Sequence, residues 1–303
     1  MQPRAMTKGQ QAVKRAFSSS DLVVLGATFF AFFVASSLYF VIGYFTSAEF
    51  SAVQGKPIEI IFGLLGTIVG SVILFGAILG LGMFMVRMQR QRVLGNSLQI
   101  EYSDYAWLRD WVNTVSADLA MPRVEVFVTQ DPVMNAYALG FARPYIIVLN
   151  SGTIRYMTQR EIKAIVVHEM AHIKYKHTDA SVYLNPFLSL PLINIFGGWV
   201  AGFWSRRAEL TADRLALMYL EDPELVKEAL IKVHVGPDVA KSMNETARQW
   251  LQYNAERPMN RFAQTFSSHP FLVRRLRHID TWKTALQPAA HKQPSSSHHG
   301  HTV

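Results

Sequence analysis

Two histidines and a glutamate in the stretch VVHEMAH, residues 166–172, have the types and spacing of a catalytic metal site. Residues four apart in an α-helix lie on the same face, so His168 and His172 can each offer a ring nitrogen to one metal ion. Glu169 is rotated by about 100° around the helix and can sit beside a metal-bound water. Zinc lowers the pKa of such a water towards neutrality, and a nearby carboxylate can accept its proton. The stretch therefore predicts two zinc ligands and one general base.

The amino-acid composition limits which residue types can bind a metal here and how readily the motif arises by chance. The chain has no cysteine, so any metal must be bound by His, Asp or Glu. In a chain with ten histidines, a chance match to H-E-x-x-H has odds of roughly one in a hundred, and coincidence is the alternative to a metal site. The neighbours Val166, Val167, Met170, Ala171 and Ile173 are all uncharged, as a helix buried beneath an active site requires. This setting favours the metal site.

A catalytic zinc needs a third protein ligand, which a second helix can supply. The spacing H-E-x-x-H-x-x-G-x-x-H is excluded, because Tyr175 and Thr178 stand where it requires glycine and histidine, and His177 is one residue off. The helical stretch RRAELTADRLAL supplies Glu209 as a ligand and, one turn later, Asp213, which can hydrogen-bond a ligand histidine and fix its tautomer. Taken alone, these acids would be read as ordinary exposed helix residues. Beside the uncharged HEMAH helix, we favour the zinc site.

Two long uncharged stretches precede these motifs and predict membrane spans at about 22–46 and 60–86. The first is too long for a cleaved signal peptide. The loop between the spans contains a single cation, Lys56, whereas seven cations flank the pair: Arg4, Lys8, Lys14 and Arg15 before it, and Arg87, Arg90 and Arg92 after it. Positive charge stays on the cytoplasmic side, so we expect an integral protein of the plasma or inner membrane whose N-terminus and catalytic domain are cytoplasmic.

The second span contains two small-residue pairs, Gly66 with Gly70 and Gly76 with Gly80. This spacing lets two membrane helices approach each other closely, so we expect the pairs to contribute to packing between the spans.

A third uncharged stretch, residues 180–204, lies between the two halves of the zinc site. A single crossing would put His172 and Glu209 on opposite sides of the membrane, where they could not share a metal. Two crossings would need about forty apolar residues, and the stretch is too short. We therefore predict an insertion that does not span, and that packs on the domain or dips into the membrane surface.

The whole pattern predicts an α+β fold in which an N-terminal two-helix transmembrane hairpin, residues 21–87, is followed by a mainly helical domain with a small β-sheet, residues 95–285. Residues 1–20 form a basic tail, and the His/Ser-rich residues 286–303 are expected to be disordered. The helix at 158–177 opens with a capping box, Thr158 with Glu161. The other expected elements are a helix at 105–120, strands at 123–129 and within 135–152, and helices at 206–220, 223–235, 240–255 and 270–285.

Four motifs resemble the HtpX-like membrane-anchored zinc metallopeptidases, the family that includes the type I CAAX prenyl proteases. They are NAYALG at 135–140, HEMAH at 168–172, SRRAELTAD at 205–213 and SSHPFLVRRL at 267–276. They occur in the family's order, and the resemblance covers roughly residues 95–283. It implies a gluzincin-type domain in which one Zn²⁺ is held by His168, His172 and Glu209, with Glu169 as base and Asp213 as the partner of a ligand.

The resemblance also implies two further roles and one departure. Asn135 and Ala136 would lie on the edge strand that pairs with a substrate peptide, although a plain core strand would read the same way. His269 would stabilise the oxyanion of the reaction, or would only precede a helix that begins at Pro270. Arg274 and Arg275 are left open between partners of an acid near the site and surface charges. Many HtpX-like proteins have a longer insertion with two spans where this chain has 180–204.

We therefore predict a membrane-anchored zinc endopeptidase that hydrolyses peptide bonds through a Glu169-activated, zinc-bound water. Its substrates would be unfolded or misassembled membrane proteins, which suggests protein quality control, and its other partner would be the lipid bilayer. The alternatives are a CAAX-type processing protease and a zinc-bound, non-catalytic membrane scaffold; the intact Glu169 speaks against the scaffold. Net charge is +8, but the cations are scattered, so we expect no nucleic-acid binding.

Overall fold

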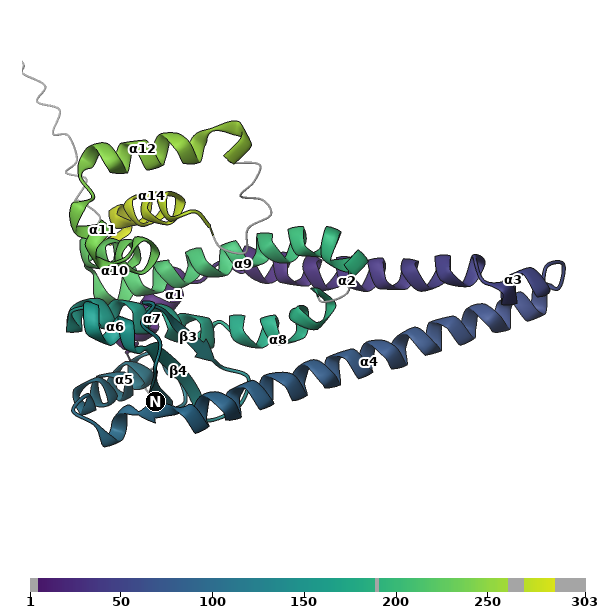
Figure 1. Ribbon diagram of the computed structural model, residues 1–303, viewed down its shortest axis with the longest axis horizontal. Coiled ribbons are helices and arrows are strands. Elements are labelled where there is room, and N and C mark those ends of the chain that lie inside the picture. Colours follow the sequence, from purple (N-terminus) through teal and green to yellow (C-terminus); the bar gives the residue numbers. More distant parts are fainter. Residues whose placement is uncertain (1–4, 189–190, 261–269, 287–303) are drawn as a thin grey trace, which may run out of the picture.

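The computed structural model describes residues 5–188, 191–260 and 270–286 of the 303-residue chain. Two long helices extend away from a body of helices and strands (Figure 1). The predicted tail at 286–303 lies outside the described residues, apart from Leu286.

The two long helices are α2 (Ser19–Phe45) and α4 (Pro57–Asn96), joined at their far end by α3 (Ala48–Ala52) (Figure 1). Within the described part of the chain, these are the two helices long and apolar enough to cross a membrane. None of the residues in the most apolar window of α4 is buried, which is the expected surface of a helix in lipid. The helices contain the predicted spans apart from Thr46, which caps the end of α2; their orientation in the membrane stays a prediction.

The packing between α2 and α4 differs from the expectation. A Cβ atom on Gly63 would lie 2.0 Å from the Tyr44 hydroxyl oxygen, so this glycine allows the close contact. Tyr44 also donates a hydrogen bond to the Ile60 carbonyl, 3.3 Å away. The expectation that the small-residue pairs pack between the spans is wrong, because no described atom lies within 4 Å of a Cβ built at any of them: Gly66, Gly70, Gly76 and Gly80. The reason is that α2 and α4 approach each other near α3 and diverge towards the domain (Figure 1).

The sheet has four strands in the order β1-β2-β4-β3, so β3 is an edge strand. The β2 and β4 strands pair in parallel, and the two outer pairings are antiparallel. The sequence predicted three of the strands, and only the short β1 was unforeseen. Their bounds are β1 Ser97–Gln99, β2 Val124–Thr129, β3 Ala136–Leu139 and β4 Tyr145–Asn150.

Helix α7 (Gln159–Lys174) carries the HEMAH stretch through the core. The predicted capping box is present: the Thr158 N–H donates to Glu161 Oε2 at 2.8 Å, and the Glu161 N–H donates to Thr158 Oγ1 at 3.3 Å. The helix ends at Lys174 rather than continuing to residue 177, because Lys176 adopts the left-handed conformation with φ 59°. Smaller elements precede α7: η1 Ile100–Tyr102, α5 Ala106–Asp118 and α6 Ser151–Tyr156.

The stretch 180–204 belongs to two helices, α8 (His177–Leu188) and α9 (Pro191–Leu220). It packs on the long helices through one apolar cluster formed by Phe32, Ala180, Leu184, Ala201, Trp204 and Ala208. Because α9 runs on without a break to Leu220, the helix predicted at 206–220 begins fifteen residues earlier than expected.

The remaining helices follow the expected order with one break. The single helix expected at 240–255 is two helices, because the Asn244 side chain accepts a hydrogen bond from the Ala247 N–H at 2.9 Å and starts a new helix there. The bounds are α10 Pro223–Val235, α11 Pro237–Ser242, α12 Glu245–Glu256, α14 Leu272–Lys283 and η2 Thr284–Leu286.

The basic N-terminal segment contains a helix that the sequence did not predict, α1 (Lys8–Ala16). Ala12 and Ala16 are buried in the core of the domain. The Tyr175 hydroxyl donates to the Val13 carbonyl at 2.9 Å. Hydropathy does not predict this helix, because its buried residues are the small Gly9, Ala12 and Ala16, although Val13 and Phe17 also contact the domain.

We expect Gly9→Ala to destabilise the domain, because its Cβ would lie 2.5 Å from the carbonyl carbon of Asp118. The cost should be about 1–3 kcal/mol, the usual range for overpacking. Thermal unfolding of the purified protein in detergent measures it. Lys14→Ala, at an exposed position of the same helix, is the control and should leave the unfolding temperature unchanged. An unaltered unfolding temperature for Gly9→Ala would contradict the docking of α1.

Candidate metal centre

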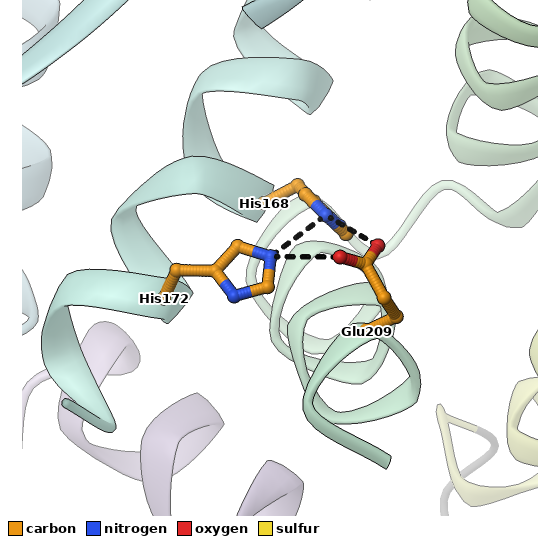
Figure 2. Close-up of side chains that lie close together, drawn as sticks. All are labelled: His168, His172 and Glu209. Carbon is orange, nitrogen blue, oxygen red and sulfur yellow. Dashed lines mark hydrogen bonds and ion pairs between the residues drawn. The ribbon is translucent and has the colours of Figure 1, made fainter. Parts of the chain in front are cut away.

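Three side chains converge where α7 and α9 cross. His168 and His172 point from α7 towards the carboxylate of Glu209 on α9 (Figure 2). His168 Nε2 is 3.2 Å from His172 Nε2 and 3.4 Å from Glu209 Oε2, and His172 Nε2 is 3.6 Å from Glu209 Oε1. The structure therefore brings together the three residues that the sequence predicted as ligands.

These distances fit one zinc ion. Around a tetrahedral zinc with bonds of about 2.0–2.2 Å, neighbouring ligand atoms lie about 3.3–3.6 Å apart. The three ligand atoms lie within 4.8 Å of one another. Two imidazoles and a carboxylate leave one tetrahedral position for water or substrate, as in catalytic zinc sites. Hence the donor set and its spacing suit a catalytic zinc.

Asp213 fixes the orientation of His168. This carboxylate is fully buried, and its Oδ1 lies 3.0 Å from His168 Nδ1. Arg275 donates to both of its oxygens, from Nε to Oδ2 at 2.8 Å and from Nη2 to Oδ1 at 2.7 Å. Burial alone would raise the pKa of Asp213, but Arg275 and His168 hold it well below its usual range. The ionised carboxylate thus keeps the Nδ1–H of His168 turned towards it and Nε2 free for a metal.

The site favours a positive charge at His168, whereas burial lowers the pKa of His172 to about 4 and keeps that ring neutral. Burial would lower the pKa of His168, but hydrogen bonds to Asp213 and Glu209 outweigh burial and raise that pKa to about 10. A cation that replaces the Nε2 proton would meet the same carboxylates. The electrostatics therefore agree with the donor geometry.

Glu169 lies beside the three residues, at the edge of the sheet. Glu169 is 9% exposed, and the backbone of Ala138 in β3 lies close enough to its carboxylate to lower its pKa slightly. Burial raises the pKa of the Glu169 carboxyl to about 7, against the opposing charge of His168. A carboxylate with a pKa near the working pH is well suited to take up and release a proton.

The sequence did not determine the positions of two residues near the site, His177 and Arg275. The sequence predicts a helix that continues to residue 177 and places His177 one residue away from a ligand position. The helix ends at Lys174 instead, and His177 Nδ1 lies 3.1 Å from His172 Nδ1. Burial lowers the pKa of His177 to about 3, so it is neutral and can accept a hydrogen bond from His172. Arg275 is 5% exposed and is a buried partner of Asp213, not a surface charge. His269 lies outside the described residues.

A cavity of about 690 Å³ joins these residues to the outer edge of β3. The Asn150 N–H donates to the Asn135 carbonyl at 3.0 Å, so these two residues form a hydrogen-bonded pair. Because such pairs alternate along an antiparallel ladder, Ala136 and Ala138 direct their N–H and C=O groups away from β4. Asn135 and Ala136 line the cavity, as does Glu169. The backbone of β3 therefore faces the metal centre.

The comparisons identify the family. Residues 103–202 and 192–283 match the family described as Peptidase family M48. This chain belongs to peptidase family M48. Both matched ranges contain part of the candidate metal centre, because the first includes α7 and the second includes Glu209. The M48 assignment agrees with an HtpX-like membrane metallopeptidase, which the four motifs indicated.

Individual relatives of this M48 peptidase are distant. It is 31% identical over 214 residues to the "Plastoglobule-localized metallopeptidase 48, chloroplastic" of Arabidopsis thaliana, which covers 64% of this chain and 62% of the relative. It is 26% identical over 195 residues to a "Protease HtpX homolog" of Fusobacterium nucleatum, covering 52% and 62%. The chain thus spans about three fifths of the length of these relatives. The crystal structure of S. mikatae Ste24p covers 92% of this chain and 78% of its own, with 17% identity and a TM-score of 0.45.

We expect Glu209→Gln to weaken zinc binding strongly, because a neutral amide is a poor zinc ligand and leaves only two histidines. Zinc content after dialysis, measured by mass spectrometry, should fall from about one ion per chain to below about one tenth. Glu228→Gln, an exposed acid on α10, should keep its zinc. Full zinc content in Glu209→Gln would exclude it as a ligand.

Proposed function

We propose that this chain is a zinc endopeptidase of the gluzincin type, anchored in the membrane by α2 and α4. His168, His172 and Glu209 would hold one zinc ion, and Glu169 would be the general base. The observation that carries the proposal is the position of Glu169: a buried carboxylate between the three ligands and the outward-facing edge of β3. A purely structural metal site has no use for such a base.

Zinc and several side chains of this chain have separate roles in the proposed reaction. Zinc, when bound, supplies a Lewis acid that polarises the scissile carbonyl and acidifies water. Glu169 accepts a proton from the attacking water and passes it to the leaving amine, for which a pKa near 7 suits both directions. Asp213 holds His168 in place, and His177 accepts from the Nδ1–H of His172. His269, which lies outside the described residues, is proposed to stabilise the oxyanion.

The substrate would be an extended polypeptide that pairs with β3. The outward N–H and C=O groups of Ala136 can add a peptide as a further strand, and Asn135 lies beside them. Backbone pairing gives little sequence preference, which suits unfolded or misassembled membrane proteins as substrates. We propose a role in membrane protein quality control, with the catalytic domain on the cytoplasmic side, as the distribution of cations predicts.

Replacing Glu169 by Gln should lower cleavage of an unfolded reporter by about 10²–10⁴-fold, the usual contribution of a general base. The zinc content should not change, because Glu169 is not among the three ligands. Glu228→Gln is the matched control and should cleave at the wild-type rate. Full activity of Glu169→Gln would refute the mechanism, and a wild-type protein that binds zinc without cleaving would favour the non-catalytic scaffold.

Ala136→Pro tests the pairing of substrate with β3. An edge strand tolerates proline where the lost N–H faces away from the sheet. Loss of one hydrogen bond to the substrate, about 1.4 kcal/mol, should lower kcat/KM about tenfold. Zinc content and unfolding temperature measured on the same variant separate this effect from misfolding. A wild-type kcat/KM in a folded, zinc-loaded variant would exclude pairing at Ala136.

A further inference from the structure

A contact between α2 and α9 relates the height of Glu209 to the start of the uncharged stretch of α2. The uncharged stretch of α2 begins directly after Asp21. Asp21 accepts a hydrogen bond from Thr211 Oγ1 at 2.5 Å and pairs with Arg207 Nη2 at 2.6 Å. These two α9 residues lie on either side of Glu209 in the sequence. The proposed ligand therefore lies at the level of the last charged residue before the lipid-facing stretch.

Helix α4 also places the metal centre at the level where an uncharged stretch ends, and it does so through different contacts. The uncharged stretch of α4 ends at Val86, and the next residue, Arg87, lines the cavity at the metal centre together with Arg90. Arg90 also donates to the Pro144 carbonyl of the loop after β3, 2.9 Å away. One end of the cavity thus reaches the point where α4 leaves the apolar layer.

The α8–α9 arm, which we define as α8 and residues 191–204 of α9, extends from this level along both long helices. Its cluster includes Phe32 of α2, about 16 Å along the helix from Asp21 at 1.5 Å per residue. Phe75 of α4 packs against the same cluster, about 18 Å from Arg87. Both long helices therefore place the apolar cluster at the same depth, about half of a hydrocarbon layer of about 30 Å.

The outer surface of the arm suits lipid. Trp199 and Phe203 of α9 are 51% and 45% exposed, and the stretch 180–204 contains no charge. Charge resumes at Arg206, whose guanidinium lies 6.0 Å from the Phe203 ring. Large aromatic side chains next to the first cation are typical of helices that enter the membrane interface. Helical backbone also satisfies its own polar groups, as the apolar layer requires.

We infer that the α8–α9 arm is a re-entrant hairpin that enters the leaflet next to the catalytic domain and does not cross it. The cavity with Glu209 and Arg87 then opens at the level of the lipid headgroups. This gives the proposed peptidase a substrate class: segments of membrane proteins that adjoin the membrane surface, reached within a few residues of a transmembrane helix. The substrate class rests on the proposed function, whereas the position of the arm does not.

The position of the arm can be tested with single cysteines, because the chain has none. Trp199→Cys and Phe203→Cys, labelled with an environment-sensitive fluorophore and reconstituted in phosphatidylcholine vesicles, should be quenched by nitroxides on the lipid chains and protected from aqueous iodide. Ile73→Cys on α4 is the membrane control, and Tyr102→Cys on η1, 80% exposed, is the aqueous control. Retained zinc shows that each variant is folded.

Quenching of the arm positions by lipid nitroxides should be at least half of that at the Ile73 control. Iodide quenching as strong as at the Tyr102 control would overturn the inference and place the arm in water. Protection from both quenchers, dependent on the ratio of protein to lipid, would also overturn it and would show that a second copy covers the arm.

The substrate class can be tested with one reporter, a single transmembrane helix followed by about forty unfolded polar residues. In vesicles, mass spectrometry should find cleavage concentrated within about ten residues of the helix. The same polar segment without its helix should be cleaved at least tenfold more slowly. Cuts spread evenly along the segment, yet abolished by Glu169→Gln, would overturn this inference alone. Cuts that persist in Glu169→Gln would refute the proposed function instead.

Discussion

The buried contact between Asp213 and Arg275 supports the rest of the metal centre. Asp213 on α9 binds His168 of α7 and Arg275 of α14, so that one carboxylate ties three helices together. Removing one partner of a buried ion pair leaves an uncompensated charge and typically costs about 3–5 kcal/mol. The position of His168 therefore depends on a residue more than a hundred positions later in the chain. Helix α14 therefore contributes to the candidate metal centre although it carries none of the three proposed ligands.

Helix α9 connects the two long apolar helices to the candidate metal centre. Within one unbroken helix it carries the apolar half of the arm, the partners of Asp21, the proposed ligand Glu209 and the orienting Asp213. A continuous helix is stiff over this length, because each residue is held by the hydrogen bonds of its neighbours. The proposed ligand Glu209 is thus set at a fixed height relative to the long helices. A flexible linker between anchor and domain would not fix that height.

The features that the sequence predicted are those that depend on the spacing of residues within one segment. Helical spacing placed His168 and His172 on one face, and the need for a third ligand led to Glu209, which the structure brings to them. It missed features that depend on contacts between distant segments. The docking of α1 depends on small buried residues that hydropathy does not register, and Gly63 replaced the expected glycine pairs because the long helices diverge. The contact of His177 with His172 was not predicted, because a left-handed Lys176 ends the helix before residue 177.

The geometry of the candidate metal centre limits the paths that the arm can take. His172 and Glu209 meet within one cluster, so the chain between them must leave and return on the same side of the membrane. The helices of the arm contribute about twelve to fourteen residues in each direction, about 18–21 Å of helix. That length is too short to cross about 30 Å of hydrocarbon and long enough to enter one leaflet. The contacts with Phe32 and Phe75 lie at that depth, so the short length of the arm and the meeting of His172 with Glu209 together favour a hairpin that enters one leaflet.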